Sequence, residues 1–167
     1  PSTEADCGEA GVPLVEVETD ASYAPGGDRS RTGLVVRYGG SIVHWLSKKQ
    51  TFTADSSCEA EMEATVAGIK TGIAIKSLIC NALNLESCGF RLVGDNSAAV
   101  TLSKEGVVSA RTRHIAGKVG WIRDHVVNDE ITVVHKMGVL LTADALTKNS
   151  DPRIAAASQE EICVDSA

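Results

Sequence analysis

The sequence predicts one α/β domain, a five-stranded mixed sheet flanked by helices. Three segments with strand patterns come first, and the second and third flank a Gly39-Gly40 pair. A long helical pattern follows them, and the rest of the chain alternates between helix and strand patterns. This order predicts an antiparallel meander of three strands, to which helical connections add parallel strands.

Residue alternation and a turn signal justify the meander. In the segment 14–20, uncharged side chains alternate with three acids, so one face of this strand is predicted to be buried and the other open. Asp20 lies at its carboxyl end, on the open face. The segments 33–38 and 41–46 are rich in β-forming residues, and a Gly-Gly pair between two such runs is typical of a tight hairpin.

The pattern changes to that of a helix at Ser56 and continues to about Leu83. Ser56 and Glu59 have the spacing of a capping box, which predicts where this helix begins. One face carries an apolar stripe at Met62, Val66, Ile69 and Ile73. The later elements are predicted to be a strand at 90–95, a short helix at 97–103, a helix at 113–127, a strand at 130–136 and a short helix from Thr142.

The two ends of the chain differ from the middle in composition. Residues 1–11 are small and acidic without periodicity, so we predict a flexible acidic arm there, a folded domain over 12–149 and a polar tail over 150–167. No apolar run reaches the roughly 18 to 20 residues of a membrane span, and the acidic start does not resemble a signal peptide. We therefore expect a soluble, intracellular protein without a membrane partner. A start at Pro1 instead of Met fits a piece of a longer protein.

The net charge of −6 is unevenly distributed. Residues 1–20 carry six acids and no base, and 150–167 carry four acids and one base, which leaves 12 acids and 15 bases between them. This central part, with a net charge of +3, is compatible with a nucleic-acid partner, whose phosphates bind basic residues. The five cysteines form no C-x-x-C pair, so we interpret them as reduced thiols and not as a zinc site or a disulfide framework.

Four carboxylates, those of Asp20, Glu61, Asp95 and Asp144, lie where strands or helices could direct them to one point. Oxygen-only ligation suits Mg²⁺ or Mn²⁺, and two such ions about 3.5 to 4 Å apart support phosphoryl transfer. The pattern therefore favours a nuclease. Three of the four acids also have a structural alternative, because Asp20 fits a solvated face, Asp95 a helix cap and Asp144 the first turn of a helix.

Glu61 has acidic neighbours at Glu59 and Glu63, and periodicity alone does not choose among the three. The capping box gives Glu59 a structural role. Glu61 instead shares its helix face with small residues that allow another element to approach closely, namely Thr65, Gly68 and Gly72.

Five segments, in this order, resemble the ribonuclease H domain of copia-type long-terminal-repeat retrotransposons: TDASYAPGGDRSRTG, SKKQTFTADSSCEAEMEA, VGDNSAAV, RTRHIAGKVGWIRD and LLTADALTK. They span the chain from about Val15 to Lys148. The resemblance implies the ribonuclease H fold, an Asp-Glu-Asp-Asp active site with two Mg²⁺ or Mn²⁺ ions, and hydrolysis of the RNA strand of RNA/DNA hybrids during reverse transcription. It also implies a reverse transcriptase domain of the same polyprotein as partner, and a location in the cytoplasm, in virus-like particles or in the nucleus.

The resemblance selects Glu61 among the helix acids and assigns roles to the tetrad. Asp20 would bridge both ions, Glu61 and Asp95 would share the second ion with it, and Asp144 would hold the ion that activates the attacking water. None of the departures from the family pattern removes a carboxylate of the tetrad; they lie at Cys58, Met62, Glu63, Ala116 and Gly120-Trp121.

Basic residues that flank the family motifs are predicted to contact substrate phosphates: Lys48, Lys49, Arg111, Arg113, His114 and Lys118. For His114, help with proton transfer at product release is the other functional interpretation, and a surface role at the start of a helix is an equal alternative. Structural roles are expected for His44, His125 and His135, and core packing for Trp45 and Trp121.

Two other functions stay open at this point. One is a catalytically silent ribonuclease H-like module that acts as an interaction domain beside a reverse transcriptase, although intact carboxylates argue against it. The other is an integrase, which shares the fold but places its glutamate late in the chain. Glu61 on the first long helix and the final Asp144 favour ribonuclease H over an integrase.

Overall fold

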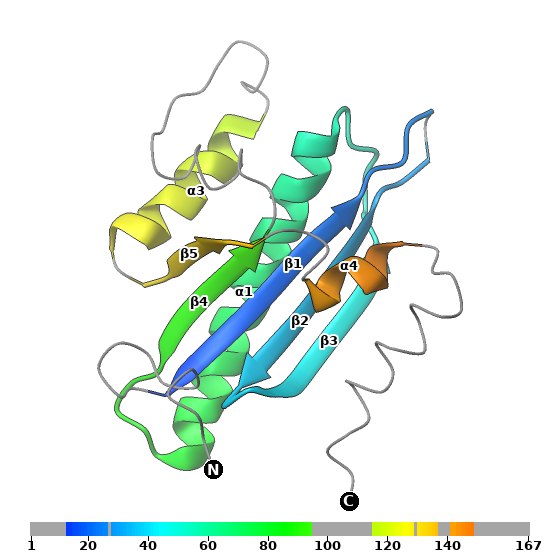
Figure 1. Ribbon diagram of the computed structural model, residues 1–167. Coiled ribbons are helices and arrows are strands. Elements are labelled where there is room, and N and C mark those ends of the chain that lie inside the picture. The colour runs from blue at the N-terminus through cyan, green and yellow to red at the C-terminus, as the bar shows by residue number, and fades with distance from the viewer. Residues whose placement is uncertain (1–12, 27, 95–114, 129, 137–140, 149–167) are drawn as a thin grey trace, which may run out of the picture.

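A computed structural model describes residues 13–26, 28–94, 115–128, 130–136 and 141–148, whose arrangement Figure 1 shows. The strands are β1 (Leu14–Ser22), β2 (Arg31–Tyr38), β3 (Ser41–Lys49), β4 (Gly89–Gly94) and β5 (Thr132–His135). The helices are α1 (Ser57–Leu83), α3 (Ala116–Val127) and α4 (Thr142–Thr147). The long helix α1 lies behind the sheet in Figure 1, and the short helix α4 lies on the opposite face.

The strands form one five-stranded sheet in the order β3-β2-β1-β4-β5. β1, β2 and β3 pair antiparallel, whereas β4 is parallel to β1 and β5 is parallel to β4, which confirms the predicted mixed sheet. β2 and β3 are longer than predicted because Arg31 and Lys49 still pair across the hairpin. The predicted helix at 97–103, the arm over 1–11 and the tail over 150–167 lie outside the described residues.

β1 is buried on both faces. Val15 and Val17 belong to the core beneath α1, as their alternation predicts. Two of the three acids on the other face are also buried, with Glu18 only 1% exposed and Asp20 only 5% exposed. The predicted open face is therefore wrong at these positions, because α4 packs over them. β1 also continues to Ser22, so Asp20 lies within the strand and not at its end.

α1 begins with the predicted capping box. The Ser56 hydroxyl accepts the Glu59 N–H at 3.2 Å, and the Glu59 carboxylate accepts the Asp55 N–H at 2.8 Å. The return bond therefore reaches one residue before the cap and not the cap itself. At the other end, Asn84 adopts the left-handed conformation that commonly ends a helix. Glu59 thus has a structural role at the start of α1.

Two glycines let α1 approach the sheet closely. A Cβ atom at Gly68 would lie 2.3 Å from Thr19 Cγ2, and one at Gly72 would lie 2.5 Å from Phe90 Cζ and 2.7 Å from Val17 Cγ2. Gly72 thus meets Val17 while Gly68 reaches Thr19, so α1 runs antiparallel to β1. The amino end of α1 consequently lies at the carboxyl end of β1, as Figure 1 shows.

α1 is long and apolar enough to span a membrane by length and composition alone, with 27 residues and a mean hydropathy of 1.3 over an 18-residue window. In this domain one face of the helix packs on the sheet, and 22% of that window is buried. Met62, Ile69 and Gly72 are buried, and Met62 and Ile69 belong to the same core as Val17.

The two tryptophans have different environments. Trp121 on α3 packs against the core, as predicted, and makes an edge contact with the His125 ring at a centroid distance of 4.4 Å. The prediction of core packing is wrong for Trp45, which is 52% exposed. Trp45 lies on the edge strand β3, whereas the six residues of α4 pack mainly on β1 and β2 and leave the outer part of β3 uncovered.

The cysteines of the described residues, Cys58, Cys80 and Cys88, are free thiols. Cys88 is buried, and burial together with the neighbouring Cys80 raises its pKa to about 11. A raised pKa keeps the proton on the sulfur, so this group favours the folded state below its ordinary value of 9.0, and the contribution is lost as the pH rises through about 11.

We expect Gly72→Ala to destabilise the domain by about 1–3 kcal/mol, because the added methyl meets Phe90 and Val17 in a packed core. Gly120→Ala on α3 is the matched control. Nothing lies within 4 Å of its Cβ position, so the better helix propensity of alanine should leave stability unchanged or raise it by up to about 1 kcal/mol. Urea unfolding of both variants tests this, and equal effects would contradict the close approach of α1.

We expect Cys88 to be alkylated by iodoacetamide at pH 9 more than about tenfold more slowly in the folded protein than in urea, because the folded thiol stays protonated. Mass spectrometry of peptides after timed labelling measures this rate separately for each cysteine. Equal rates in the two states would show that Cys88 is accessible and ionised.

Candidate active site

A threonine at the end of α4, Thr147, contacts Asp20 of β1. The Thr147 hydroxyl hydrogen-bonds to the buried Asp20 carboxylate and lies 3.0 Å from the backbone oxygen of Asp144. Asp20 and Asp144 are 124 positions apart in the chain, yet one turn of α4 separates Asp144 from the residue that contacts Asp20. Two of the four predicted carboxylates thus lie on neighbouring elements, β1 and α4.

Asp144 lies in the first turn of α4, as predicted. Its side chain is 20% exposed, and its carboxylate accepts a hydrogen bond from Lys148 Nζ at 2.6 Å. Lys148 is largely exposed, so this is a surface ion pair on the helix, which contributes little to stability. The Asp144 carboxylate is therefore reachable from solvent, while Asp20 lies deeper.

A glycine in β2 lets α4 lie directly on the sheet. Gly33 pairs with Asp20 across β1 and β2. A Cβ atom at Gly33 would lie 2.7 Å from the backbone oxygen of Ala143 and 2.7 Å from Thr147 Cγ2. The backbone of α4 thus touches the sheet at the position next to Asp20, and this contact sets how near Asp144 comes.

Glu61 approaches the same end of the sheet from the other face. It precedes Thr65, Gly68 and Gly72 on α1, and all three are buried, which confirms that this helix face packs closely. Gly68 meets Thr19, and Glu61 lies about 10 Å closer than Gly68 to the amino end of α1. Because α1 runs antiparallel to β1, Glu61 is level with the carboxyl end of β1. Glu61 itself is partly exposed.

Asp95 lies outside the described residues, so its position stays a prediction. β4 ends one residue earlier, at Gly94, which pairs with Thr19 of β1. The chain therefore leaves β4 beside Asp20. No group of three or more His, Cys, Asp or Glu side chains suited to a metal gathers among the described residues, which do not include Asp95.

Of the predicted phosphate-binding residues, three are described. Lys48 and Lys49 are exposed at the end of β3, and Lys49 pairs with the exposed Asp28 at 3.2 Å. Lys118 on α3 instead pairs with Glu63 of α1 at 2.8 Å and lies 4.5 Å from the ring centroid of Phe52. Lys118 therefore links two helices. Arg111, Arg113 and His114 lie outside the described residues.

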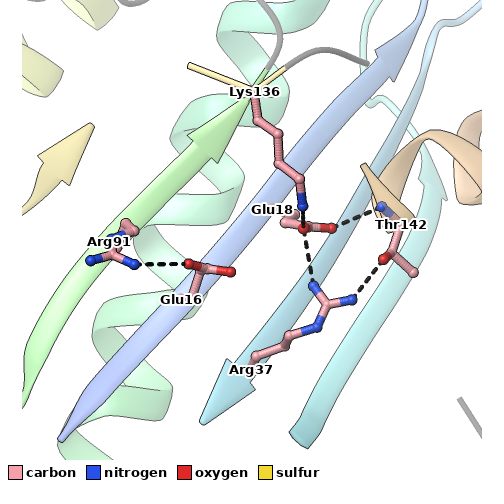
Figure 2. Close-up of polar contacts among 6 residues, drawn as sticks. All are labelled: Glu16, Glu18, Arg37, Arg91, Lys136 and Thr142. Atoms are coloured by element: carbon pink, nitrogen blue, oxygen red, sulfur yellow. Dashed lines mark hydrogen bonds and ion pairs between the residues drawn. The ribbon is translucent and has the colours of Figure 1, made fainter. Parts of the chain in front are cut away.

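The sequence does not single out Glu18, which has the most extensive polar contacts near the site. Its carboxylate lies 3.1 Å from Arg37 Nη1 and 2.9 Å from Lys136 Nζ, and it accepts the Thr142 N–H at 2.9 Å (Figure 2). Burial raises the pKa of Glu18, but the bonds and charges of Lys136 and Arg37 outweigh burial and lower its pKa overall. By contrast, Glu16 is partly exposed and pairs with Arg91 at 3.4 Å.

One signal in the sequence pointed to Glu18. It lies two residues before Asp20, so both side chains project from the same face of β1. Any element that covers Asp20 is therefore close to Glu18 as well, and a buried glutamate needs partners. Its partners come from distant parts of the chain, and no spacing in the sequence connects them.

Two curated proteins are similar to this chain over most of its length. The Pol polyprotein of transposon TNT 1-94 from Nicotiana tabacum is 33% identical over 138 residues, which cover 81% of this chain and 10% of the polyprotein. The Pol polyprotein of transposon RE1 from Arabidopsis thaliana is 34% identical over 140 residues, covering 78% of this chain and 9% of the polyprotein. The chain thus spans about a tenth of the length of these relatives. No family model matches it.

Solved structures share the fold at low sequence identity. A ribonuclease H1 isolated from compost superposes with a TM-score of 0.56 at 16% identity, over 87% of this chain and 91% of that one. The same enzyme in complex with an RNA/DNA hybrid superposes with a TM-score of 0.53 at 17% identity, over 74% of this chain and 85% of that one. The N-terminal ribonuclease H domain of a Mycobacterium tuberculosis protein superposes with a TM-score of 0.56 at 14% identity, over 89% of this chain and 97% of that one.

The sheet order, the helices on both of its faces and these superpositions define a domain of the ribonuclease H fold. The chain belongs to the Pol polyproteins of copia-type retrotransposons, because two such polyproteins are 33% and 34% identical to it over most of its length, and it forms a domain with the ribonuclease H fold.

We expect Gly33→Ala to displace α4 from the sheet, because its methyl would meet the backbone oxygen of Ala143, which cannot move without the helix. The core under α1 should stay folded, at a cost of about 1–3 kcal/mol. Hydrogen exchange of the α4 amides, 142–147, measures the displacement and should become faster, while Gly120→Ala should leave it unchanged. Unchanged protection of α4 in Gly33→Ala would contradict the close contact.

Proposed function

We propose that this domain is a metal-dependent endonuclease that hydrolyses the RNA strand of RNA/DNA hybrids. The observation that carries the proposal is the Thr147 hydroxyl, which connects the buried Asp20 carboxylate to the turn of α4 that bears Asp144. The two carboxylates thus lie on touching elements, β1 and α4, and the Asp144 carboxylate is open to solvent. They suit a site for hard cations.

The donor set fits Mg²⁺ or Mn²⁺. Asp20, Glu61 and Asp144 offer carboxylate oxygens, the ligands that these ions prefer, and no described histidine or cysteine is among the predicted ligands. We propose Asp20, Glu61, Asp95 and Asp144 as the residues that hold two ions. Bound there, the ions would supply the Lewis acid that lowers the pKa of the attacking water and stabilises the departing 3′ oxygen.

Residues of this chain would prepare the site before metal binds. The Thr147 hydroxyl orients the Asp20 carboxylate from one side, and the hydrogen bond from Lys148 reduces the repulsion that Asp144 exerts on neighbouring acids. Both contributors lie on α4 or directly after it. The products would be a 5′-phosphate and a 3′-hydroxyl.

The hybrid would bind mainly through its phosphates and its groove shape. Thr32 pairs with Ala21 and with Lys48, so Lys48 is two strands away from β1, about 10 Å, and near the level of Asp20. Lys48 and Lys49 would therefore contact phosphates beside the site, and Arg111, Arg113, His114 and Lys118 are further candidates. Contacts to the 2′-hydroxyl would select RNA. The solved hybrid complex of the compost enzyme supports this substrate class.

The domain would act beside a reverse transcriptase of the same polyprotein, since both curated relatives are Pol polyproteins that are far longer than this chain. We propose that it acts in the cytoplasm, in virus-like particles or in the nucleus of the host cell.

We expect the protein to cut the RNA of a strand-labelled RNA/DNA hybrid only when Mg²⁺ or Mn²⁺ is present, and to leave single-stranded RNA intact. Asp20→Asn, Asp95→Asn and Asp144→Asn should each lower turnover more than about a hundredfold, because each removes a metal ligand worth several kcal/mol of transition-state stabilisation. Gel analysis of the labelled strands measures the rate, and EDTA should abolish it.

Asp124→Asn is the matched control, because Asp124 is an exposed acid on α3, away from the tetrad. It should retain full turnover. A folded wild-type protein that binds the metal but does not cut the hybrid would reject the proposal for the isolated domain and favour the silent interaction module.

A further inference from the structure

Glu18 is a buried carboxylate that the proposed metal site does not use. At 1% exposure it is as buried as the core valines beside it. Its donors come from three different elements: Arg37 on β2, Lys136 directly after β5, and the Thr142 backbone at the start of α4. Figure 2 shows all three converging on one carboxylate above β1. Glu18 thus ties the last helix to both halves of the sheet.

The contact between Glu18 and Thr142 supplies what α4 lacks. Six residues are too few to form a stable helix alone. The cap residue of α4, Leu141, gives no side-chain hydrogen bond, so the first N–H groups of the helix need another acceptor. Glu18 accepts one of them from across the sheet, and a negative charge at this end also interacts favourably with the helix dipole.

The remaining contacts fix the direction of α4. Arg37 donates to the Thr142 hydroxyl at 2.6 Å as well as pairing with Glu18, so one guanidinium holds both partners. At the opposite end of α4, the Ser47 hydroxyl donates to the backbone oxygen of Leu146 at 2.6 Å. α4 is therefore held at both ends, by charged groups at its start and by a neutral hydroxyl at its end.

An irregularity in the sheet lies next to Arg37. The pairing of β2 with β3 shifts between Val36 and Arg37, which pair with His44 and Ile42 respectively. Val43 is the extra residue of this bulge. Bulges change the direction of nearby side chains and often lie close to active sites. Here the bulge occurs at the residue that reaches Glu18.

We propose that Glu18 is a positioning residue of the active site, which holds the first turn of α4 so that Asp144 stays at its working distance from Asp20. Asp144 is two residues after Thr142, in the same turn, so a shift of the Thr142 backbone moves Asp144 with it. The role in catalysis rests on the proposed function, whereas the role in holding α4 does not.

The first test is Glu18→Gln, which keeps the shape and removes the charge. We expect faster hydrogen exchange of the α4 amides in this variant. The kcat for hybrid cleavage should be about 10- to 100-fold lower, while the KM for the hybrid stays unchanged. The Mg²⁺ concentration that gives the half-maximal rate should rise. Glu16→Gln is the matched control: it lies on the same face of β1 and pairs with an arginine, Arg91, which belongs to β4 and not to α4. It should change none of these quantities.

The second test retains the charge of Glu18 and changes its partner on α4. Thr142→Pro removes the N–H that Glu18 accepts, and proline is well tolerated at the first position of a helix, where Leu141 already has the extended backbone that precedes proline. Thr142→Ala removes the hydroxyl alone. The expected result is that Thr142→Pro loosens α4 and lowers kcat more than Thr142→Ala does, with both proteins folded.

Each outcome decides one part of the proposal. If Glu18→Gln does not fold, the comparison of Thr142→Pro with Thr142→Ala still decides, and equal exchange and equal kcat in these two would overturn the proposal. Wild-type exchange of α4 in folded Glu18→Gln would also overturn it. If the wild-type protein does not cleave the hybrid, the proposed function fails, while the exchange of α4 still shows whether Glu18 holds the helix.

Discussion

Burial of two acids on one face of β1 is the constraint on which the candidate site depends. Glu18 and Asp20 lie about 7 Å apart under α4, and a buried carboxylate is costly unless charged partners or hydrogen bonds compensate it. Glu18 receives Arg37, Lys136 and a backbone amide, whereas Thr147 supplies Asp20 with a neutral hydroxyl. The protein thus compensates the charge of Glu18 with its own cations, and it orients the Asp20 carboxylate with the Thr147 hydroxyl.

The local patterns of the sequence were sufficient to predict the strands, the meander and the start of α1. The alternation in β1 and the capping box at Ser56 are properties of neighbouring residues, and they correctly predict a strand and the start of α1. The open face of β1 and the burial of Trp45 were wrong for a common reason. Each depends on how far α4 extends over the sheet, and a helix of six residues gives no signal of where it packs.

The candidate site was predictable to the extent that it depends on motifs. Asp20 and Asp144 lie on adjacent elements as the family motifs imply, while Glu61 reaches the same end of the sheet along the face marked by Gly68 and Gly72. Glu18 was not predictable from motifs, because its partners Arg37 and Lys136 are 19 and 118 positions away. Contacts of this kind follow from the fold and not from the local sequence.

The exposed edge of the sheet has a consequence for self-association. β3 ends the sheet, and its side chains Val43 and Trp45 are exposed, which would ordinarily invite a strand of another molecule to pair alongside. The bulge at Val43 interrupts the regular spacing of its backbone groups, and Lys48 and Lys49 place two positive charges at its end. Copies of the domain are thereby discouraged from joining into a continuous intermolecular sheet.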